Sequence, residues 1–474
     1  MAVTSSISQG IEIGRRALEA QQAALNATSH NIANANTPGF SRRQVNLQSV
    51  GPGLRGGIGG GVDVATVERQ HSRFLNAQVR MEKQVLGRWD ALEGSLQSVE
   101  LIFNEPAGAG SSEVGTVFNE PSGTGLSGSL SRFWNAWQDL ANVPESGAAR
   151  AVLQQEGIFL TEMLHQYNDQ LLETHQELNA SIIDEVDEIN EILDQIATIN
   201  REIPRANFEG GSAADLEDAR DQLLEQLSFK VDISTVEKAN GQVSVLLSGH
   251  NLVELDRAVH LRVRQLSSGG LPVARLSFAD DGTMADIREG RLQGLMQARD
   301  EVIPGVIASL DEIAAGMVEE VNLIHQKAFG LTGATGLNFF EADKVNARNI
   351  SLDQTILGDL NSIAASADGA PGDNGAALAI SSLRNKQMLA GGTKTVDSFY
   401  HELLGEVGAR SKEAQTMARN HRLLDSQLEN RRESVVGVSL NEEAAQLVLF
   451  QRAYQAAART VSIVDDLLEV TINL

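Results

Sequence analysis

Side chains capable of chemistry are plentiful in this chain of 474 residues, but their spacing does not match the usual catalytic or cofactor-binding patterns. Gly51, Gly53 and Gly56 fit G-x-G-x-x-G, which binds dinucleotides when a strand precedes it and a helix follows immediately. The next residues, 57–61, read Gly-Ile-Gly-Gly-Gly and cannot open a helix. We therefore interpret this stretch as a glycine-rich surface loop.

Histidine and cysteine, the commonest transition-metal ligands, are equally uninformative. The nine histidines form neither His-x-x-x-His nor His-Glu-x-x-His, so the usual zinc spacing is missing. The chain has no cysteine, which excludes thiolate sites and disulfides. Nucleophile-elbow, phosphate-loop and EF-hand patterns are missing too. We expect no catalytic residue, no cofactor, no metal site and no enzymatic activity.

Charge narrows the classes of partner. The formal net charge is −25, whereas binding to nucleic acid or to anionic lipid requires a basic face. The acidic run Asp184, Glu185, Asp187 and Glu188 is expected to be a solvated helix face. The N-terminus resembles no secretory signal peptide, and no apolar stretch is long enough to span a membrane. We expect no nucleic-acid partner and no membrane contact.

The elements that must position any site begin with a helix near the N-terminus. Its apolar residues recur every seven positions, which is typical of a helix that lies along another helix. This stripe consists of Ile7, Ile11, Leu18, Leu25 and Ile32. Gly14 and Gln21 interrupt it, so we expect it to be weak in isolation. The helix should end at 34–39, where Pro38 and Gly39 disfavour continuation.

A matching stripe lies at the other end of the chain. Its residues are also seven apart: Leu440, Leu447, Tyr454, Val461 and Leu468. Glu442 and Glu443 place negative charge where the dipole of the helix favours it. We predict that the two terminal helices pair with each other, the alternative being that each packs on its own domain.

The middle of the chain is predicted to be mainly helical. Only 4% of the residues in the whole chain are aromatic, and the reliance on aliphatic residues suits long, thin helices. The helices are expected at 68–104, 126–140, 147–200, 215–227, 292–329, 376–390 and 394–433, with Pro204 and the loop at 209–212 ending the third. Four strands at 230–235, 242–247, 260–265 and 273–278 are separated by turns that include Asn240-Gly241. A loop with Asn-Glu-Pro at 104–106 is repeated at 119–121.

The order of elements implies that the chain runs outward and returns, so that its domains are discontinuous. The predicted fold is mainly α, with a small inserted β region, elongated, and with the terminal helices paired as a coiled-coil inner domain. We predict an inner domain from 1–66 with 435–474, a helical middle domain from 67–228 with 286–434, and a β insertion at 229–285.

Residues 29–42, Ser-His-Asn-Ile-Ala-Asn-Ala-Asn-Thr-Pro-Gly-Phe-Ser-Arg, resemble the signature that follows the first helix in flagellar axial proteins. The signature positions are Asn31, Asn34, Asn36, Thr37, Pro38, Gly39 and Phe40. Residues 118–144 and 437–459 narrow the resemblance to the hook-associated protein 1 family, over nearly the whole chain. The repeated Asn-Glu-Pro loop departs from the family pattern. Few residues separate Phe339-Phe340 from 347–350, so a large outer domain is expected to be absent or reduced.

The resemblance implies a structural subunit that joins the flagellar hook to the filament. It implies export through the flagellar type III channel without a cleaved signal, with a cytoplasmic chaperone masking the C-terminal helix. The expected partners are identical subunits in a ring, the hook protein and a second junction protein. We expect the two terminal stripes to form the assembly interface. The alternatives are a hook or distal-rod protein, a soluble enzyme, and a cytoplasmic coiled-coil scaffold.

Overall fold

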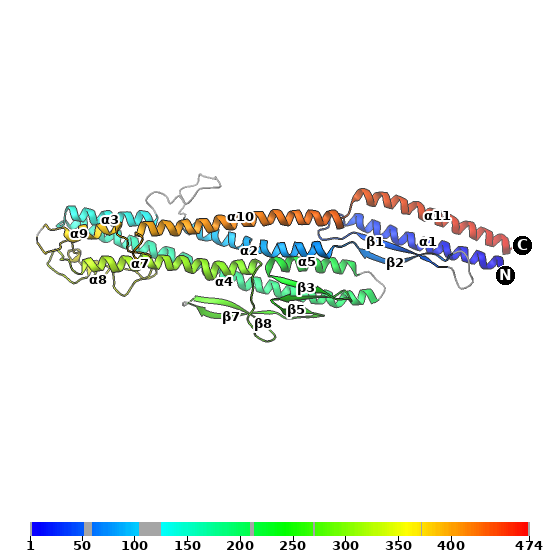
Figure 1. The fold of residues 1–474 in the computed structure, drawn as a ribbon, viewed down its shortest axis with the longest axis horizontal. Coiled ribbons are helices and arrows are strands. Elements are labelled where there is room, and N and C mark those ends of the chain that lie inside the picture. Colours follow the sequence, from blue (N-terminus) through cyan, green and yellow to red (C-terminus); the bar gives the residue numbers. More distant parts are fainter. Residues whose placement is uncertain are drawn as a thin grey trace.

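The computed structural model describes residues 2–51, 59–103, 125–208, 213–268, 271–370 and 372–472. Figure 1 shows a long helical rod with a thinner helix pair at one end, where both chain termini lie. Small sheets lie beside the rod. The mainly helical, elongated fold with an inserted β region and paired terminal helices is as predicted. The repeated Asn-Glu-Pro loop lies outside the described residues.

The thinner end contains α1 (Ala2–Ala33) and α11 (Leu440–Ile472), which run antiparallel. A hairpin of β1 (Arg43–Val50) and β2 (Gly61–Arg69) packs against α1. This hairpin was not predicted, so the inner domain of paired terminal helices also contains strands. In β1, polar residues alternate with Val45 and Leu47, which is a strand pattern. The alternation covers only a few residues, so it is a weak signal in the sequence.

The rod is built from six longer helices. They are α2 (Arg73–Phe103), α3 (Leu126–Asn142), α4 (Gly147–Phe208), α5 (Ala214–Lys230), α7 (Ile303–His325) and α10 (Val396–Val436). A continuous apolar core of mostly aliphatic side chains extends along the rod. The helices α2 and α10 lie antiparallel, and charged pairs such as Lys83–Asp425, 3.3 Å apart, connect them.

Helix α4 does not end at Pro204 as predicted but continues to Phe208. Proline removes the N–H that would bond the carbonyl of Asn200, four residues earlier. The Gln242 side-chain amide donates to that carbonyl at 2.9 Å, and the Asn200 amide in turn donates to the Val243 carbonyl at 2.7 Å. Because the β insertion supplies the missing donor, the helix tolerates the proline.

The β insertion forms two small sheets. The first contains β3 (Ile233–Glu237), β4 (Val243–Leu247), β5 (His250–Glu254) and β6 (Arg257–Ala258), in that order, and the second pairs β7 (Leu261–Ser268) with β8 (Leu271–Phe278). The strands β5 and β6 were not predicted. The turn is only Ser248-Gly249, both with positive φ, so His250 already pairs with β4.

The end of the rod far from the termini consists of short elements around an aromatic cluster. The elements are α8 (Gln354–Gly358), η2 (Leu360–Ser362), α9 (Gly375–Ser382) and η3 (Leu383–Asn385). The helix α6 (Arg291–Gln297) and the π-helical turn η1 (Ala298–Val302) lie instead beside the middle of α2 and lead directly into α7. Phe133, Trp134 and Trp137 are buried core residues, as predicted, and Phe339 and Phe340 join them.

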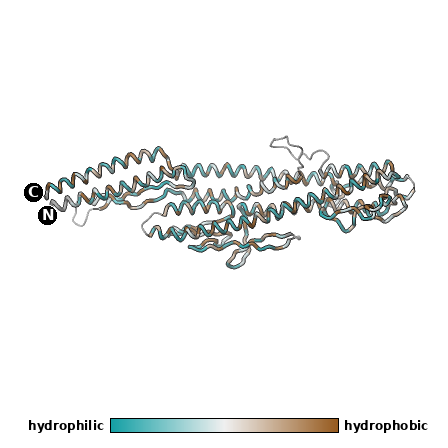
Figure 2. The backbone as a smooth tube through the Cα atoms, turned by 180° about the vertical axis from the view of Figure 1, so that it is seen from behind, coloured by the Kyte–Doolittle hydropathy of each residue, from teal (hydrophilic) through white to brown (hydrophobic). Residues whose placement is uncertain are grey.

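Polarity is distributed differently in the two parts of the molecule. Figure 2 shows apolar and polar residues mixed along both terminal helices. Large apolar side chains on α11 remain exposed, whereas those of the rod are mostly buried. None of the helices in the described part of the chain is long and apolar enough to cross a lipid bilayer.

His325, at the end of α7, is held in one neutral tautomer within the aromatic cluster. Its Nδ1 lies 2.7 Å from the carbonyl oxygen of Leu337, and its Nε2 accepts from the backbone N–H of Ala364 at 2.9 Å. Burial lowers the pKa of His325 to about 4. A second proton would occupy the nitrogen that accepts from Ala364, so protonation removes that bond.

We predict that the distal rod is acid-sensitive. Between about pH 6.5 and pH 4, His325 is protonated in the unfolded chain but neutral in the folded protein. Stability should therefore fall through that window, by roughly 3 kcal/mol at 1.36 kcal/mol per pKa unit. Urea unfolding at a series of pH values should show this loss in the wild type. His325→Phe should lack it, and the exposed His401→Phe should keep it. An unchanged pH profile in His325→Phe would contradict the prediction.

Candidate functional site

The signature segment after α1 forms a tight, self-capped connection to β1. Asn34 Nδ2 donates to the carbonyl of His30 at 3.0 Å, which satisfies a carbonyl at the helix end. The hydroxyl of Thr37 donates to Asn34 Oδ1 at 3.2 Å, and the Phe40 N–H donates to the Thr37 carbonyl at 3.2 Å. The asparagines and Thr37 thus fix the chain reversal that follows α1.

Gly39 is required at the tip of this connection. Its φ is +75°, as expected for the glycine after Pro38, and a Cβ would lie 2.1 Å from Nε2 of Gln222 in α5. The same Gln222 amide hydrogen-bonds the carbonyl of Pro38. The positive φ therefore favours glycine at this position, and a larger residue would also have to displace the Gln222 side chain that bonds the signature.

Asn31 connects the two terminal helices to the hairpin. It is buried, and its amide donates to the Arg43 carbonyl at 2.9 Å and to Glu443 Oε2 in α11 at 3.0 Å. Its Oδ1 accepts from the Arg43 N–H at 2.8 Å. Glu443 is also fully buried and pairs with Arg42 Nε at 2.7 Å. We predicted that Glu443 would serve the helix dipole, but it bonds the signature directly.

A second buried carboxylate, Asp218 of α5, connects the terminal end to the rod. It accepts from the N–H and the hydroxyl of Ser41 at 3.1 and 2.7 Å. It also lies 2.8 Å from Arg43 Nη2 and 3.0 Å from Arg69 Nη1. Asp218 therefore accepts four charge-assisted hydrogen bonds at the open end of the hairpin, where β1 begins and β2 ends.

The charges at this joint are balanced by neighbouring acids of α5. Arg69, at the end of β2, also pairs with Glu217 at 2.7 Å and Asp221 at 2.8 Å. Burial alone would lower the pKa of Arg69, but these carboxylates more than offset it and raise that pKa above its usual value. The guanidinium is therefore permanently charged, and the joint is an electrostatic contact at neutral pH.

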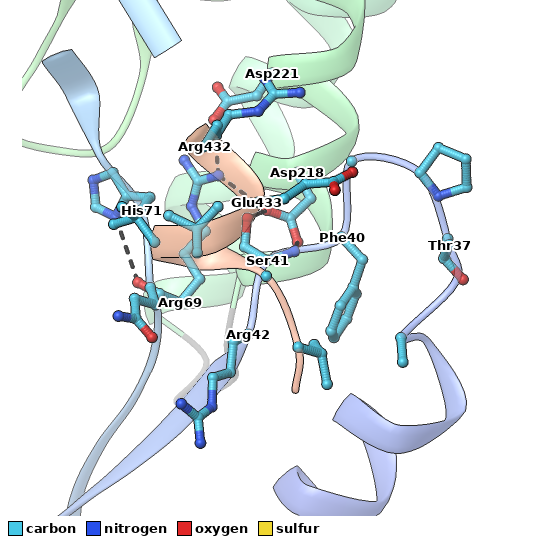
Figure 3. A pocket seen from close by; sticks show the side chains of 18 of the residues that line it. Thr37, Phe40, Ser41, Arg42, Arg69, His71, Asp218, Asp221, Arg432 and Glu433 are labelled. Carbon is cyan, nitrogen blue, oxygen red and sulfur yellow. Dashed lines mark hydrogen bonds and ion pairs between the residues drawn. The ribbon is translucent and has the colours of Figure 1, made fainter. Parts of the chain in front are cut away.

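A cleft of about 750 Å³ opens beside the joint, between residues 35–42, 69–71, α5 and 432–439. Figure 3 shows Ser41, Arg69 and Asp218 on its wall, with Thr37 and Phe40 along the signature. Several of its charged side chains are paired with one another: Arg69 with Asp221, Arg432 with Glu225, and Arg42 with Glu442. This arrangement holds three segments of the chain together.

The terminal helices approach each other most closely at small residues of α1. A Cβ on Gly14 would lie 2.4 Å from Cγ2 of Val461, and one on Gly10 would lie 3.5 Å from Val464. The fully buried positions of α1 are Gly14, Ala20, Ala24, Thr28 and Asn31. Gly14 is therefore a contact point, and its interpretation as an interruption of the seam is wrong.

The predicted stripes are only partly covered in the single chain. Ile11, Leu18, Leu25 and Ile32 are half-buried on α1, and so are Leu447, Tyr454, Val461 and Leu468 on α11. Leu440 is exposed, and the side chain of Ile7 lies outside the described part. Asn36, Thr37, Pro38 and Gly39 are exposed, whereas Asn34 and Phe40 are half-buried.

A group of potential metal ligands occurs at one turn of the β insertion. In the part of the chain that the structure describes, ligand atoms of His250, Asp280 and Asp281 lie within 4.8 Å of one another. The acids are engaged in the turn itself, since Asp281 accepts from the N–H of Thr283 and Asp280 from that of Asp281, both at 2.8 Å. His250 stacks on Phe278, with ring centroids 4.2 Å apart.

The sequence analysis missed most residues of the joint. Arg43, Arg69, Asp218 and Glu443 form it, yet only the doublets Arg42-Arg43 and Glu442-Glu443 mark it in the sequence. Both doublets are short and lie at predicted element ends, where charged residues are common. The partner of Arg43 is 175 positions away, so spacing could not reveal it.

We predict that Asp218→Ala loosens the joint. Removing one partner of a buried ion pair typically costs several kcal/mol, and we expect about 3 kcal/mol because Arg69 keeps its other acids. The matched control is Asp215→Ala, since that side chain is 72% exposed and also pairs with Arg43. The control should cost less than about 1 kcal/mol. Urea unfolding followed by circular dichroism measures both, and equal effects would contradict the prediction.

We also predict that Gly14→Leu separates the terminal helices. The new side chain must displace Val461, and overpacking of this kind costs roughly 2 kcal/mol. Trypsin should then cleave the arginines of α1 and α11 faster than in the wild type. Gly94→Leu is the control, because a Cβ on Gly94 in α2 meets nothing within 4 Å. Similar cleavage rates in both variants would refute the contact.

Comparison with known proteins covers both the joint and the rod. The profile of the flagellar hook-associated protein FlgK helical domain matches residues 111–340. That of the flagella basal body rod protein matches 11–40, and that of the flagellar basal body rod FlgEFG protein C-terminal matches 433–474. The terminal matches therefore contain the residues of α1, the signature and α11 that the joint brings together.

Individual relatives agree with the profiles. Flagellar hook-associated protein 1 of Bacillus subtilis is 29% identical, and the alignment covers 99% of this chain and 98% of the relative. The Escherichia coli protein of that name is 23% identical over 96% of this chain and 98% of its own. The solved flagellar hook junction protein FlgK from Burkholderia pseudomallei shares the fold, with a TM-score of 0.65 over 76% of this chain and 100% of that chain, at 14% identity. Over nearly its whole length, the chain is similar to the flagellar hook-associated protein 1 family.

Proposed function

We propose that this chain is a structural, non-enzymatic subunit of the bacterial flagellum that joins the hook to the filament. One observation carries the proposal: the two segments that match flagellar rod families fold into a single helix pair at one end of the rod. The relatives are named for the hook and its junction. A long rod with its attachment end formed by both termini suits a protein that works by assembly.

The chain divides into structural units at the short connections between its elements. We propose an inner unit of α1, the β1–β2 hairpin and α11, a middle unit of the rod helices, and the β insertion. Since β2 continues to Arg69 and α10 ends at Val436, the boundaries between inner and middle units lie at 70–72 and 437–439. Residues 341–353 connect closely packed elements of the distal rod, which supports a reduced outer domain.

The inner unit provides the proposed assembly interface. The α11 helix turns one side toward α1 and leaves six large apolar side chains exposed elsewhere: Leu440, Val448, Leu449, Ile463, Leu467 and Val470. Contiguous exposed apolar surface on a helix typically marks a contact with another molecule. We propose that identical subunits in a ring cover this surface, and that burial offsets the entropy of ordering the terminal helices.

The remaining partners follow from this position in the flagellum. The inner unit would contact the hook protein on one side and a second junction protein on the other. A cytoplasmic chaperone would mask the apolar surface of α11 before export through the flagellar type III channel, without a cleaved signal. The final location is then the hook–filament junction outside the cell.

We predict that two substitutions in α11 abolish assembly for different reasons. Val461→Asp puts a charge against Gly14 and should open the helix pair in the monomer. Leu447→Asp should act in the same way. Ile463→Asp lies on the outer side, where Ile463 is 60% exposed, so the monomer should stay folded while filaments are lost. Ser462→Asp, an exposed neighbour, is the control.

Circular dichroism of the purified monomers and electron microscopy of complemented cells separate these effects. Normal filaments with Val461→Asp or Ile463→Asp would refute the proposed interface. Deletion of the gene tests the function itself, because a junction subunit is needed only after the hook is complete. Hooks without filaments, with flagellin in the medium, are expected. Missing hooks would indicate that the protein belongs to the rod or the hook. Normal filaments would refute the proposal.

A further inference from the structure

The outer face of the β7–β8 hairpin carries positive charge that the described part of the chain pairs only at Arg275. Arg264 of β7 lies directly opposite Arg275 of β8, and Arg262 is two residues away on the same face. Like charges in opposed positions destabilise an antiparallel pair. Arg275 approaches Asp300 only at 3.8 Å, and Arg262 and Arg264 form no ion pair with any residue that the structure describes. Leu266, next on this face, is 54% exposed.

The hairpin is held rigidly on the rod. Side chains of α4 bond its backbone, since Asn179 Oδ1 accepts from the Ala274 N–H at 2.7 Å and Asn190 Oδ1 from the Leu261 N–H at 2.8 Å. The fully buried Arg299 donates to the Ala274 carbonyl at 3.0 Å. Figure 1 shows the hairpin at the edge of the rod, outside the helical bundle. The arginine face is therefore presented in a fixed orientation and not on a loose arm.

A long surface of the opposite sign runs along α4. Residues 151–200 contain eleven acidic residues and neither Lys nor Arg. The exposed acids recur at three, four or seven positions and form one stripe: Glu162, Asp169, Glu173, Glu177, Asp184, Asp187 and Glu191. At 1.5 Å per residue the stripe is about 44 Å long. Its carboxylates form no ion pair within the described chain. We term these residues the acidic stripe.

We propose that the arginine face of one copy docks on the acidic stripe of the next copy. This inference rests on the proposed ring of identical subunits and names a lateral contact within it, outside the terminal helices. Two different, complementary patches on one chain produce a head-to-tail contact, which closes into a ring when the rotation permits. Each exposed pair contributes little alone, so the arginines align neighbouring rods while Leu266 adds apolar contact.

Site-directed photocross-linking tests the contact directly. Because the chain has no cysteine, Leu266→Cys creates a single thiol for a benzophenone maleimide. The labelled protein is assembled onto hooks of a strain lacking the native gene and irradiated there. We expect a cross-linked dimer whose joined peptides are the hairpin and residues 151–200. Leu331→Cys, an exposed leucine of the distal rod, is the control and should give no such dimer.

Charge reversal provides the second measurement. Arg262→Glu with Arg264→Glu should lower the dimer yield roughly tenfold, since like charges then oppose each other. Reversing the two stripe acids nearest the cross-link to Arg should restore it. Lys327→Glu with Arg348→Glu changes the net charge equally at exposed positions far from the hairpin in the sequence, and should leave the yield unchanged.

Three results would overturn the inference. They are a chain that stays monomeric on flagella after irradiation, a cross-link to a different flagellar protein, and an equal loss in the control reversal. In these cases the chain still lies at the junction, so the proposed function survives. If even the wild-type chain is missing from purified flagella, the proposed function fails, and the lateral contact fails with it.

Discussion

The buried carboxylate of Asp218 is the interaction on which the arrangement of this molecule depends. The chain passes between the inner unit and the rod through short connections at 70–72 and 437–439. Asp218 of α5 bonds Ser41, Arg43 and Arg69, which lie at the two ends of the β1–β2 hairpin. A buried charge is costly unless it is fully paired, so the hairpin must return to α5 in one orientation. The joint therefore sets the direction of the helix pair relative to the rod.

The helix pair itself is built for close approach and not for stability in isolation. Gly14 and the alanines of α1 let α11 come near, but small side chains bury little apolar area. The large apolar residues of α11 face outward instead. In the proposed ring, neighbouring subunits would cover these residues, and their burial would offset the entropy of ordering the helix pair.

The rod and the β insertion form one mechanical unit because each supplies what the other lacks. Gln242 bonds the α4 carbonyl that Pro204 leaves free, and Arg299 holds the backbone of β8. The insertion is therefore fastened along α4 at several points. This fixed geometry gives the lateral face of the rod a defined pattern of charge, with arginines on the hairpin and acids along the helix. The two proposed contacts, lateral and axial, therefore lie in different parts of the chain.

The sequence by itself determined the long helices, the paired ends and the family signature, because apolar periodicity, Pro38-Gly39 and the terminal motifs are local features. Positions near strand and helix ends were less well determined: the β1–β2 hairpin was missed and α4 was ended too early at Pro204. Only the tertiary structure decided the joint and the role of Gly14. Asp218 meets Arg43, and Gly14 meets Val461, across long stretches of chain, and no spacing rule relates such positions. In the sequence, a glycine in a helix looks unfavourable and an acid on a helix surface looks incidental. Only the distant partner in the folded structure shows why each is needed.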